Sequence, residues 1–395
     1  MKIIAVLETN CSAGGGFNQA LSAIMQMQQI SKANFEFSVV TNIAENVEYL
    51  AKLGIQSNIF KYSLLDRIFP TIRSNWITGR LVTRFNLLSS FERKLKRLGA
   101  DLVYFVMPSA TSNKLQTLNY VSTVWDLCHR DFPEFPEVRN FGVFQKREDL
   151  YTETLGSSIL IITESEQGAA AVVRRYGIDR ERTLAMPLSP SPFVSSSNSL
   201  GLEEVMLINN LKAGYYFYPA QLWPHKNHIR IIDAVALLQK QGIIIQVVFV
   251  GGDKGLATHL RKRIASLQLE DQVKILGFVP SSHMRGLYEG CAAVVMPTYF
   301  GPTNIPPLEA WSIGRPLIYS SHLFEQAGDA ALLVDPDEVE ALSEAMRKVL
   351  DSSIANSLVE KGFHRLTQIE ENRKEAEHEL LCRLRTFEKR LQSWN

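Results

Sequence analysis

Two short segments in the second half of the chain carry residues suited to holding a phosphorylated ligand. Residues 300–307, here the proline loop, form a turn of small residues ending in two prolines, which the first turn of a helix tolerates. Backbone N–H groups at such a helix start can bind a diphosphate, helped by the helix dipole. Lys226, in the lysine loop of residues 221–227, can neutralise one phosphate charge. Glu309 can accept hydrogen bonds from two ribose hydroxyls; the alternative is an acidic residue that only favours a helix N-terminus.

A glycine triplet, residues 14–16, follows the first apolar run and opens a helical pattern. Glycines at this place let a phosphate or a sugar approach the backbone and the helix N-terminus. The dinucleotide fingerprint needs a further glycine at position 19 and an acidic residue at the end of the second strand, where the chain has Gln19 and Asn42. A nicotinamide site is therefore not indicated, and a tight strand-to-helix turn is the alternative to a ligand site.

The spacing of candidate ligands does not indicate a metal site. The four cysteines lie far apart, which excludes a zinc ribbon built from cysteines alone and suits a reducing compartment. The histidines show no H-x-x-x-H spacing. Asp335 and Asp337 have a D-x-D spacing, but their place between a strand and a helix predicts an N-cap, with Glu338 in the first turn. We expect no metal and no cofactor.

Short apolar runs alternate with amphipathic segments in both halves of the chain. The expected strands are residues 3–7, 36–41, 102–107, 122–125, 158–163, 215–218, 243–250, 273–276, 292–296 and 316–319. Helical patterns intervene at residues 17–30, 228–239, 256–268 and 308–313. Residues 187–201 hold six serines and three prolines, which is typical of a linker. The alternation predicts an α/β chain of two Rossmann-like domains, with parallel sheets facing across a cleft.

Five motifs of the second half occur in a set order and spacing. They are residues 218–227, 248–252, 273–279, 296–310 and 330–336. This series resembles the C-terminal domain of the retaining glycosyltransferases of family 4, also called group 1, which have the GT-B fold. The resemblance covers residues 215–350, and in the first half it is carried by residues 14–16, 123–134 and 165–187.

The resemblance implies a division of labour along the chain. Residues 1–200 would form the acceptor-binding domain, residues 201–369 the nucleotide-sugar-binding domain, and residues 370–395 a C-terminal helix that packs back on the first domain. The tail shows one apolar stripe, which needs a docking surface. The implied activity is a hexosyltransferase type: transfer of a sugar, with retention, from a nucleotide-diphosphate donor to a hydroxyl of a saccharide, free or lipid-linked. The implied setting is bacterial cell-surface polysaccharide or glycan assembly.

The resemblance also implies roles for single residues. Asp126 and His129 would touch the sugar or the acceptor, and Lys226 would stabilise the leaving diphosphate; a structural role of His129 is the alternative. In many members a histidine precedes the aspartate, and here Trp125 takes that place. The donor-binding residues implied by the motifs are Gly15, Gly16, Gln221, Lys226, Gly251, Val279, Gly301, Thr303, Asn304, Ile305 and Glu309.

Two positions depart from the family pattern. The family often has a glutamate eight residues before Glu309, where this chain has Gly301, and an arginine five residues before Lys226, where it has Gln221. One carboxylate near the sugar and one positive charge near the diphosphate are thus missing. Either this is a subgroup that replaces both, or activity is reduced. The alternatives to a transferase are a catalytically weak nucleotide-sugar-binding subunit and a GT-B sugar-nucleotide epimerase.

Residues 61–97 concentrate positive charge in a balanced chain. They hold nine basic and two acidic residues, a local charge of +7, interleaved with apolar and aromatic residues, whereas the whole chain carries +1. Such a stretch can lie on an anionic membrane, and a solvated helix packed on the sheet is the alternative.

The near-zero net charge of the whole chain argues against a nucleic-acid partner. No apolar run reaches ~18 residues, and the N-terminus is typical of a strand rather than a signal peptide. We expect a cytoplasmic protein, free or peripheral on the inner face of the membrane.

Overall fold

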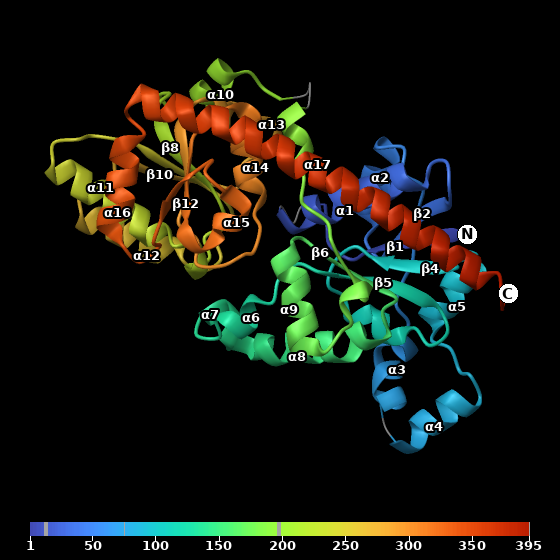
Figure 1. Ribbon diagram of the computed structural model, residues 1–395. Coiled ribbons are helices and arrows are strands. Elements are labelled where there is room, and N and C mark those ends of the chain that lie inside the picture. Colours follow the sequence, from blue (N-terminus) through green and yellow to red (C-terminus); the bar gives the residue numbers. More distant parts are fainter. Residues whose placement is uncertain (12–14, 75, 196–198, 395) are drawn as a thin grey trace. The chain divides into compact units, whose positions relative to one another are not determined.

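The computed structural model of the chain describes residues 1–11, 15–74, 76–195 and 199–394 and consists of two compact units (Figure 1). Unit 1 comprises Met1–Leu127, Phe144–Leu188 and Arg373–Asn395, and unit 2 comprises Cys128–Val143 and Ser189–Asn372. Each unit contains one sheet in which all neighbouring strands are parallel. The predicted α/β class is therefore confirmed.

The sheet of unit 1 has seven strands in the order β3-β2-β1-β4-β5-β6-β7. The strands are β1 (Lys2–Leu7), β2 (Glu36–Thr41), β3 (Ser57–Ile59), β4 (Leu102–Phe105), β5 (Asn119–Val124), β6 (Leu160–Thr163) and β7 (Thr183–Ala185). The central strand β1 is buried over five successive residues, because helices cover both faces of a parallel sheet. This is why its sequence is continuously apolar rather than alternating.

The helices of unit 1 connect these strands. They are α1 (Gly15–Ser31), α2 (Ala44–Lys52), α3 (Leu64–Ser74), α4 (Trp76–Arg84), α5 (Ser90–Arg97), α8 (Val143–Thr154) and α9 (Glu166–Tyr176). Local sequence fixes several ends. In α9 the N-cap Ser165 accepts a hydrogen bond from the Gly168 amide, and Gly177 ends the helix in the left-handed region at φ +64°.

The sheet of unit 2 has six strands in the order β10-β9-β8-β11-β12-β13. They are β8 (Tyr215–Pro219), β9 (Val247–Val250), β10 (Val273–Gly277), β11 (Cys291–Met296), β12 (Leu317–Ser320) and β13 (Leu332–Val334). The helices of this unit are α6 (Cys128–Asp131), α7 (Pro136–Arg139), α10 (Leu202–Ile208), α11 (His228–Lys240), α12 (Ala257–Ser266), α13 (Ser281–Glu289), α14 (Ile305–Ile313), α15 (Phe324–Ala327) and α16 (Val339–Lys348).

The unit boundaries differ from the expected domain ranges in the middle of the chain. Unit 1 ends at Leu188 rather than at residue 200, because the short 3-10 helix Pro192–Ser195 packs against α13 and α14. Cys128–Val143, expected in the first domain, belongs to unit 2. Phe132 and Phe135 explain this, since their rings pack against Phe300.

The last helix, α17 (Ser352–Leu391), is 40 residues long and begins well before residue 370, where the tail helix was expected to start. Asp351 marks this earlier start, because its carboxylate accepts a hydrogen bond from the Ser353 amide at 2.8 Å. The first part of α17 belongs to unit 2. There Gly362 packs closely on the Trp311 ring, because a Cβ on residue 362 would lie only 2.5 Å from that ring. From Arg373 onward it belongs to unit 1, and Leu380 and Leu384 are buried in the core formed with α1 and β1.

β13 was expected only as the strand before Asp335, and two strands, β3 and β7, went unpredicted. Each has only three residues and lies at an edge of the unit 1 sheet, so neither shows a periodic pattern long enough to detect. In the described part of the chain, no helix combines the length and apolar character needed to cross a bilayer.

Candidate functional site

The lysine and proline loops lie together at the carboxyl edge of the unit 2 sheet. The lysine loop follows β8 and the proline loop follows β11, and these strands are neighbours. The His225 carbonyl accepts hydrogen bonds from the Tyr299 amide at 2.9 Å and the Thr298 hydroxyl at 3.2 Å. Asn227, at φ +60°, donates to the Pro297 carbonyl at 3.1 Å. The carboxyl edge is where open α/β sheets bind ligands.

Lys226 reaches from one loop to the other. Its ammonium donates to Asn304 Oδ1 at 3.3 Å, and the buried Tyr218 hydroxyl donates to the Lys226 carbonyl at 2.9 Å. The tyrosine thus fixes the backbone from which the lysine extends. This arrangement places a cation beside the N-terminus of α14, which Asn304 precedes.

Asn304 is the centre of a buried polar network rather than a free donor. Its amide N–H donates to Gln326 Oε1 at 2.9 Å, its side-chain nitrogen donates to the Tyr319 hydroxyl at 2.7 Å, and that hydroxyl donates to Gln326 Oε1 at 2.8 Å. Gln326 thus occupies the Asn304 amide, one of the N–H groups at the start of α14. Thr303 is half-buried, and Ile305 begins α14.

Gly301 has a conformational reason to be glycine. Its φ is +110°, which side chains rarely adopt, and a Cβ there would lie 3.2 Å from Asn304 Oδ1. The Asn304 side-chain nitrogen donates to the Gly301 carbonyl at 3.2 Å. A glutamate at position 301 would therefore need a different loop conformation.

Glu309 is buried within unit 2. It is the fifth residue of α14, beyond the first turn, so the helix-start alternative is wrong. The Tyr288 hydroxyl donates to Glu309 Oε2, and the Ser191 side chain and backbone also hydrogen-bond to the carboxylate. Burial raises the pKa of Glu309 against the lowering effect of these hydrogen bonds. Tyr288 and Ser191 were missed, because the residues that orient a carboxylate lie far from it in sequence.

Gln221, which stands where the family often has an arginine, makes a side-chain hydrogen bond within the lysine loop. Its side-chain oxygen accepts a hydrogen bond from the Trp223 indole at 3.0 Å. The Lys254 ammonium lies 5.6 Å from the centroid of the Trp223 ring. Lys254 follows β9 and was not predicted, since a single exposed lysine in a turn gives no pattern. A second cation is thus present at the same edge of the sheet.

Gly251 is required by a close approach of two backbones. Its φ is +154°, and a Cβ would lie 2.3 Å from the Ala220 carbonyl oxygen. The Leu222 amide donates to the Gly252 carbonyl at 3.1 Å, so the loops after β8 and β9 run alongside each other. Val279 is half-buried in the connection between β10 and α13.

His225 joins the lysine loop to the segment Cys128–Val143 of the same unit. Its ring nitrogen Nδ1 pairs with Glu137, whose Oε1 also accepts the His225 amide at 3.0 Å. The His225 ring stacks on Phe300 with centroids 3.9 Å apart. Burial raises the pKa of Glu137, but hydrogen bonds and charge from His225 outweigh it and hold the pKa low. This pair was also missed by sequence reasoning.

The remaining predicted residues divide between the units. His129 is fully buried in α6 of unit 2. In unit 1, Asp126 forms an ion pair of 2.6 Å with Arg147. Burial disfavours the charge on Arg147, but the nearby Asp126 carboxylate outweighs burial and raises the pKa of Arg147. The Trp125 ring lies against Gly16, 3.6 Å from where a Cβ would be, and Gly15 begins α1. Gly14 lies outside the described residues.

The D-x-D pair does not cap α16. The N-cap is Glu338, which makes no side-chain cap bond, and Asp335 instead accepts from the Asp337 amide at 2.9 Å. The Tyr299 hydroxyl donates to Asp337 at 2.7 Å. The N-cap prediction is therefore wrong: Asp335 closes the turn before α16 but lies three residues before the N-cap, too early to bind the helix amides. In the described residues, no three His, Cys, Asp or Glu side chains gather as a metal site would require.

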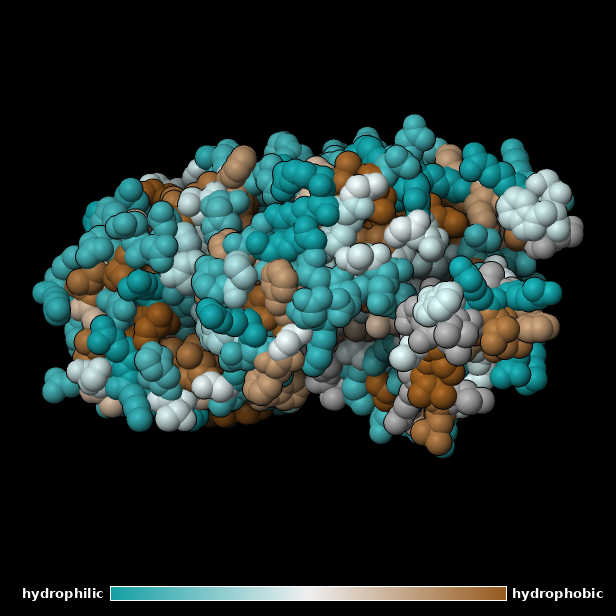
Figure 2. Space-filling model, turned by 90° about the horizontal axis from the view of Figure 1, so that it is seen from below, coloured by the Kyte–Doolittle hydropathy of each residue, from teal (hydrophilic) through white to brown (hydrophobic). Residues whose placement is uncertain are grey.

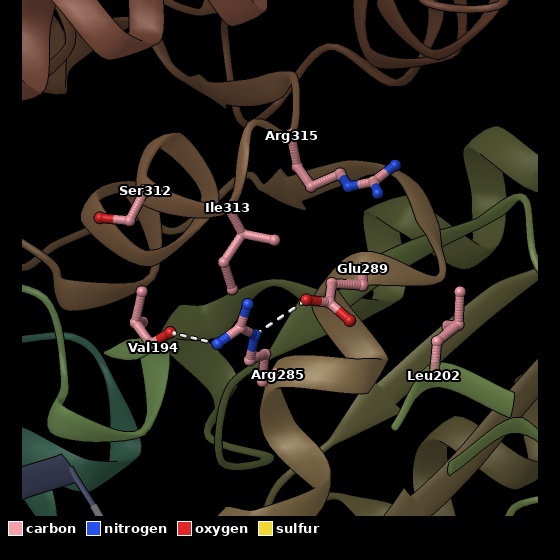
Figure 3. A pocket seen from close by; sticks show the side chains of 7 residues that line it. All are labelled: Val194, Leu202, Arg285, Glu289, Ser312, Ile313 and Arg315. Atoms are coloured by element: carbon pink, nitrogen blue, oxygen red, sulfur yellow. Dashed lines mark hydrogen bonds and ion pairs between the residues drawn. The ribbon is translucent and has the colours of Figure 1, made fainter. Parts of the chain in front are cut away.

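Unit 2 also contains a pocket of about 430 Å³ (Figure 3). It is lined by Val194, Leu202, Arg285, Glu289, Ser312, Ile313 and Arg315. Arg285 donates to Glu289 at 2.8 Å and to the Val194 carbonyl at 3.3 Å. Arg315 donates to the carbonyl of Cys291, the first residue of β11, so the pocket adjoins the amino edge of the sheet. No predicted donor-binding residue lines it.

Comparison with known proteins identifies the larger part of unit 2. Residues 207–365 match the family described as glycosyl transferases group 1. This chain carries a group 1 glycosyl transferase domain. The match includes both loops, and it confirms the family resemblance that the ordered motifs indicated.

Two curated relatives match about half of the chain and half of their own length. The O-antigen chain mannosyltransferase B of Escherichia coli is 27% identical over 195 residues, 48% of this chain and 51% of the relative. The O-antigen chain mannosyltransferase RfbU of Salmonella typhimurium is 26% identical over 192 residues, 48% of this chain and 50% of the relative.

Solved structures match nearly the whole chain. The Anabaena protein HepE in complex with UDP-glucose has a TM-score of 0.70 at 16% identity, covering 96% of this chain and 99% of that one. WaaG, a glycosyltransferase involved in lipopolysaccharide biosynthesis, has a TM-score of 0.63 at 15% identity, with 95% and 98% covered. The group 1 glycosyl transferase domain is thus part of a GT-B fold, as predicted.

Proposed function

We propose that this protein is a retaining glycosyltransferase that moves a sugar from a nucleotide-diphosphate donor to a hydroxyl of a saccharide acceptor in bacterial surface-polysaccharide assembly. The observation that carries the proposal is the contact between Lys226 and Asn304 at the carboxyl edge of the unit 2 sheet. It places a cation beside a helix N-terminus, a combination suited to a diphosphate. The relatives named as O-antigen chain mannosyltransferases support the acceptor class.

In the proposed reaction, the bond between the anomeric carbon and the diphosphate breaks, and negative charge grows on the leaving group. Lys226 and the start of α14 stabilise that charge. Lys254, held near Trp223, adds a second positive charge on the side where Gln221 replaces an arginine. Glu309, oriented by Tyr288, accepts hydrogen bonds from the donor ribose. In unit 1, Asp126 is held by its ion pair with Arg147, and contact with the sugar or the acceptor is its proposed role.

A thermal-shift screen against UDP, GDP, dTDP and their sugars tests the donor assignment. We expect one nucleotide to raise the melting temperature, and its sugar to be hydrolysed slowly without acceptor. A protein that melts at the same temperature with every nucleotide contradicts the proposed function. Binding without hydrolysis or transfer would favour the nucleotide-sugar-binding subunit, which Gly301, Gln221 and the occupied Asn304 amide favour.

We also propose that the reaction uses no metal ion, because protein groups supply the positive charge near the diphosphate. Treatment with EDTA should leave turnover unchanged. Loss of turnover on chelation that manganese or magnesium restores would contradict this, and the same samples assayed for nucleotide binding would show whether the metal serves binding or transfer.

The helices α3 and α4 of unit 1 offer a surface for an anionic membrane, where a lipid-linked acceptor would be found. Leu64 and Trp76, the first residues of α3 and α4, are 78% and 69% exposed, and Phe85, which follows α4, is 64% exposed. Arg80 lies 5.1 Å from the centroid of the Trp76 ring. Figure 2 shows hydrophobic side chains gathered over the region of these helices, the lowest elements of Figure 1. We therefore propose a peripheral location.

A further inference from the structure

Glu8 lies at the switch point of the unit 1 sheet. It directly follows β1, and the strand order β3-β2-β1-β4 means that the chain leaves β1 in one direction and returns with β4 on its other side. Open parallel sheets bind their ligands outside the carboxyl ends of the two strands at such a point. The place alone therefore marks the surroundings of Glu8 as a candidate binding site within unit 1.

Hydroxyl groups from two further connections converge on the Glu8 carboxylate. The Tyr62 and Thr111 hydroxyls donate to Oε1, the latter at 2.7 Å, and the Ser109 hydroxyl donates to Oε2. Ser109 follows β4 and caps the 3-10 helix Ala110–Lys114, while Tyr62 follows β3. The Lys114 ammonium lies 4.2 Å from the centroid of the Tyr62 ring.

The cluster has hydrogen-bonding capacity to spare. An ionised carboxylate can accept about four hydrogen bonds, and among the described residues three donors reach Glu8. Lys114 has three N–H donors, of which one makes a long bond of 3.4 Å to Thr111 Oγ1. Both side chains are only half-buried. An acceptor and a donor thus lie side by side at a partly open surface, which matches the hydroxyl groups of a sugar.

Asp66 of the same unit shows what a purely structural carboxylate looks like here. It is fully buried, Oδ1 accepts from the Phe91 amide at 2.9 Å, and Oδ2 accepts from the Ser63 amide at 2.9 Å and from the Ser63 and Ser90 hydroxyls. Its capacity is used entirely by groups that hold α3 and α5 in place. Glu8 differs in both exposure and remaining capacity.

We propose that Glu8 and Lys114 form the subsite that binds hydroxyl groups of the acceptor saccharide. The inference rests on the proposed function and names residues for the acceptor side of it. Tyr62, Ser109 and Thr111 hold the Glu8 carboxylate in position from β3 and β4. Burial and the adjacent Glu8 raise the pKa of Tyr62, so its hydroxyl stays a donor to the carboxylate.

Saccharide binding to the full chain tests this subsite without knowledge of the natural acceptor. The probes are the methyl glycosides of mannose, galactose, glucose and N-acetylglucosamine, titrated by ligand-observed NMR. The variants are Glu8→Gln and Lys114→Met. Asp101→Asn is the matched control, since Asp101 binds the Lys2 amide at the amino end of β1. UDP and GDP binding is measured on the same samples.

We expect Glu8→Gln and Lys114→Met to weaken glycoside binding by about tenfold or more, as loss of a charge-assisted hydrogen bond does. Asp101→Asn should bind like the wild type, and nucleotide binding should be unchanged in all three. If Glu8→Gln fails to fold, Lys114→Met decides. Unchanged glycoside binding in the variants, or a wild type that binds nucleotide but no glycoside, overturns the subsite. If the wild type binds neither UDP nor GDP, that result contradicts the proposed function rather than the subsite.

Discussion

Lys226 is the charged side chain on which the proposed donor site depends most. Lys226→Ala should weaken donor binding and lower turnover by about tenfold or more, the effect of one lost charge-assisted contact. Lys240→Ala is the matched control, because Lys240 is exposed at the far end of the following helix, α11. Calorimetry of nucleotide binding and a transfer assay check both variants, and equal donor affinity in the two would contradict the assignment.

His228 adds a pH dependence to folding at the residue scale. The ring is fully buried between Tyr218 and Phe249, and burial, helped by Lys226, lowers its pKa to about 3 from 6.5. The unfolded chain therefore binds a proton that the folded chain does not between these two values. The free energy of unfolding is therefore unaffected by His228 above about pH 6.5 and decreases as the pH falls from there toward about 3, because protonation favours the unfolded chain.

Replacing His228 by phenylalanine should flatten that dependence. One proton taken up on unfolding corresponds to at most about 1.4 kcal/mol per pH unit. Urea unfolding of the wild type and His228→Phe at pH 7, 6 and 5 measures the two slopes. A wild type whose free energy of unfolding falls no faster than that of the variant would show that His228 is not neutral in the folded state.

At the scale of elements, α17 is the helix whose packing is easiest to test. Leu384→Ala removes a side chain that is 2% exposed in the core of unit 1, and should lower the free energy of unfolding by about 2–5 kcal/mol. Thr386→Ala, on the exposed face of the same helix, is the control and should change it by less than about 0.5 kcal/mol. Denaturant unfolding followed by circular dichroism compares them, and similar values would show that the stripe is not docked.

At the scale of the whole molecule, the surface of α3 and α4, with the exposed Arg80 and Arg84, is the reason to expect the protein on an anionic membrane. The protein should sediment with anionic vesicles at low salt and be released at high salt, because the Debye length falls from ~10 Å at ~0.1 M to ~3 Å at ~1 M. Arg80→Glu with Arg84→Glu should abolish vesicle binding and leave transfer to a free saccharide unchanged.

The charge-matched control replaces Arg261 and Lys262 of α12 by glutamate, since both are exposed in unit 2. It should bind vesicles like the wild type. A wild type that stays in solution with anionic vesicles at low salt would assign the surface to solvent or to a free saccharide.

The sequence by itself determined the α/β class, the residue ranges of the main strands and the positions of the lysine and proline loops. Buried parallel strands need continuous apolar runs, and phosphate-binding turns need glycine and proline at fixed places, so both leave a local pattern. The edge strands β3 and β7 left none, because three residues cannot show a period. The start of α17 was also missed, although Asp351 marks it: its carboxylate accepts a hydrogen bond from the Ser353 amide at 2.8 Å.

Only the tertiary structure decided which groups surround the candidate site residues. Gln326 on the Asn304 amide, Tyr288 on Glu309 and Arg147 on Asp126 are each 21 or more residues from their partner. The assignment of Cys128–Val143 to unit 2 likewise depends on Phe132 and Phe135 meeting Phe300. Such contacts are set by how strands and helices pack, and packing between distant segments leaves no local pattern in a single sequence.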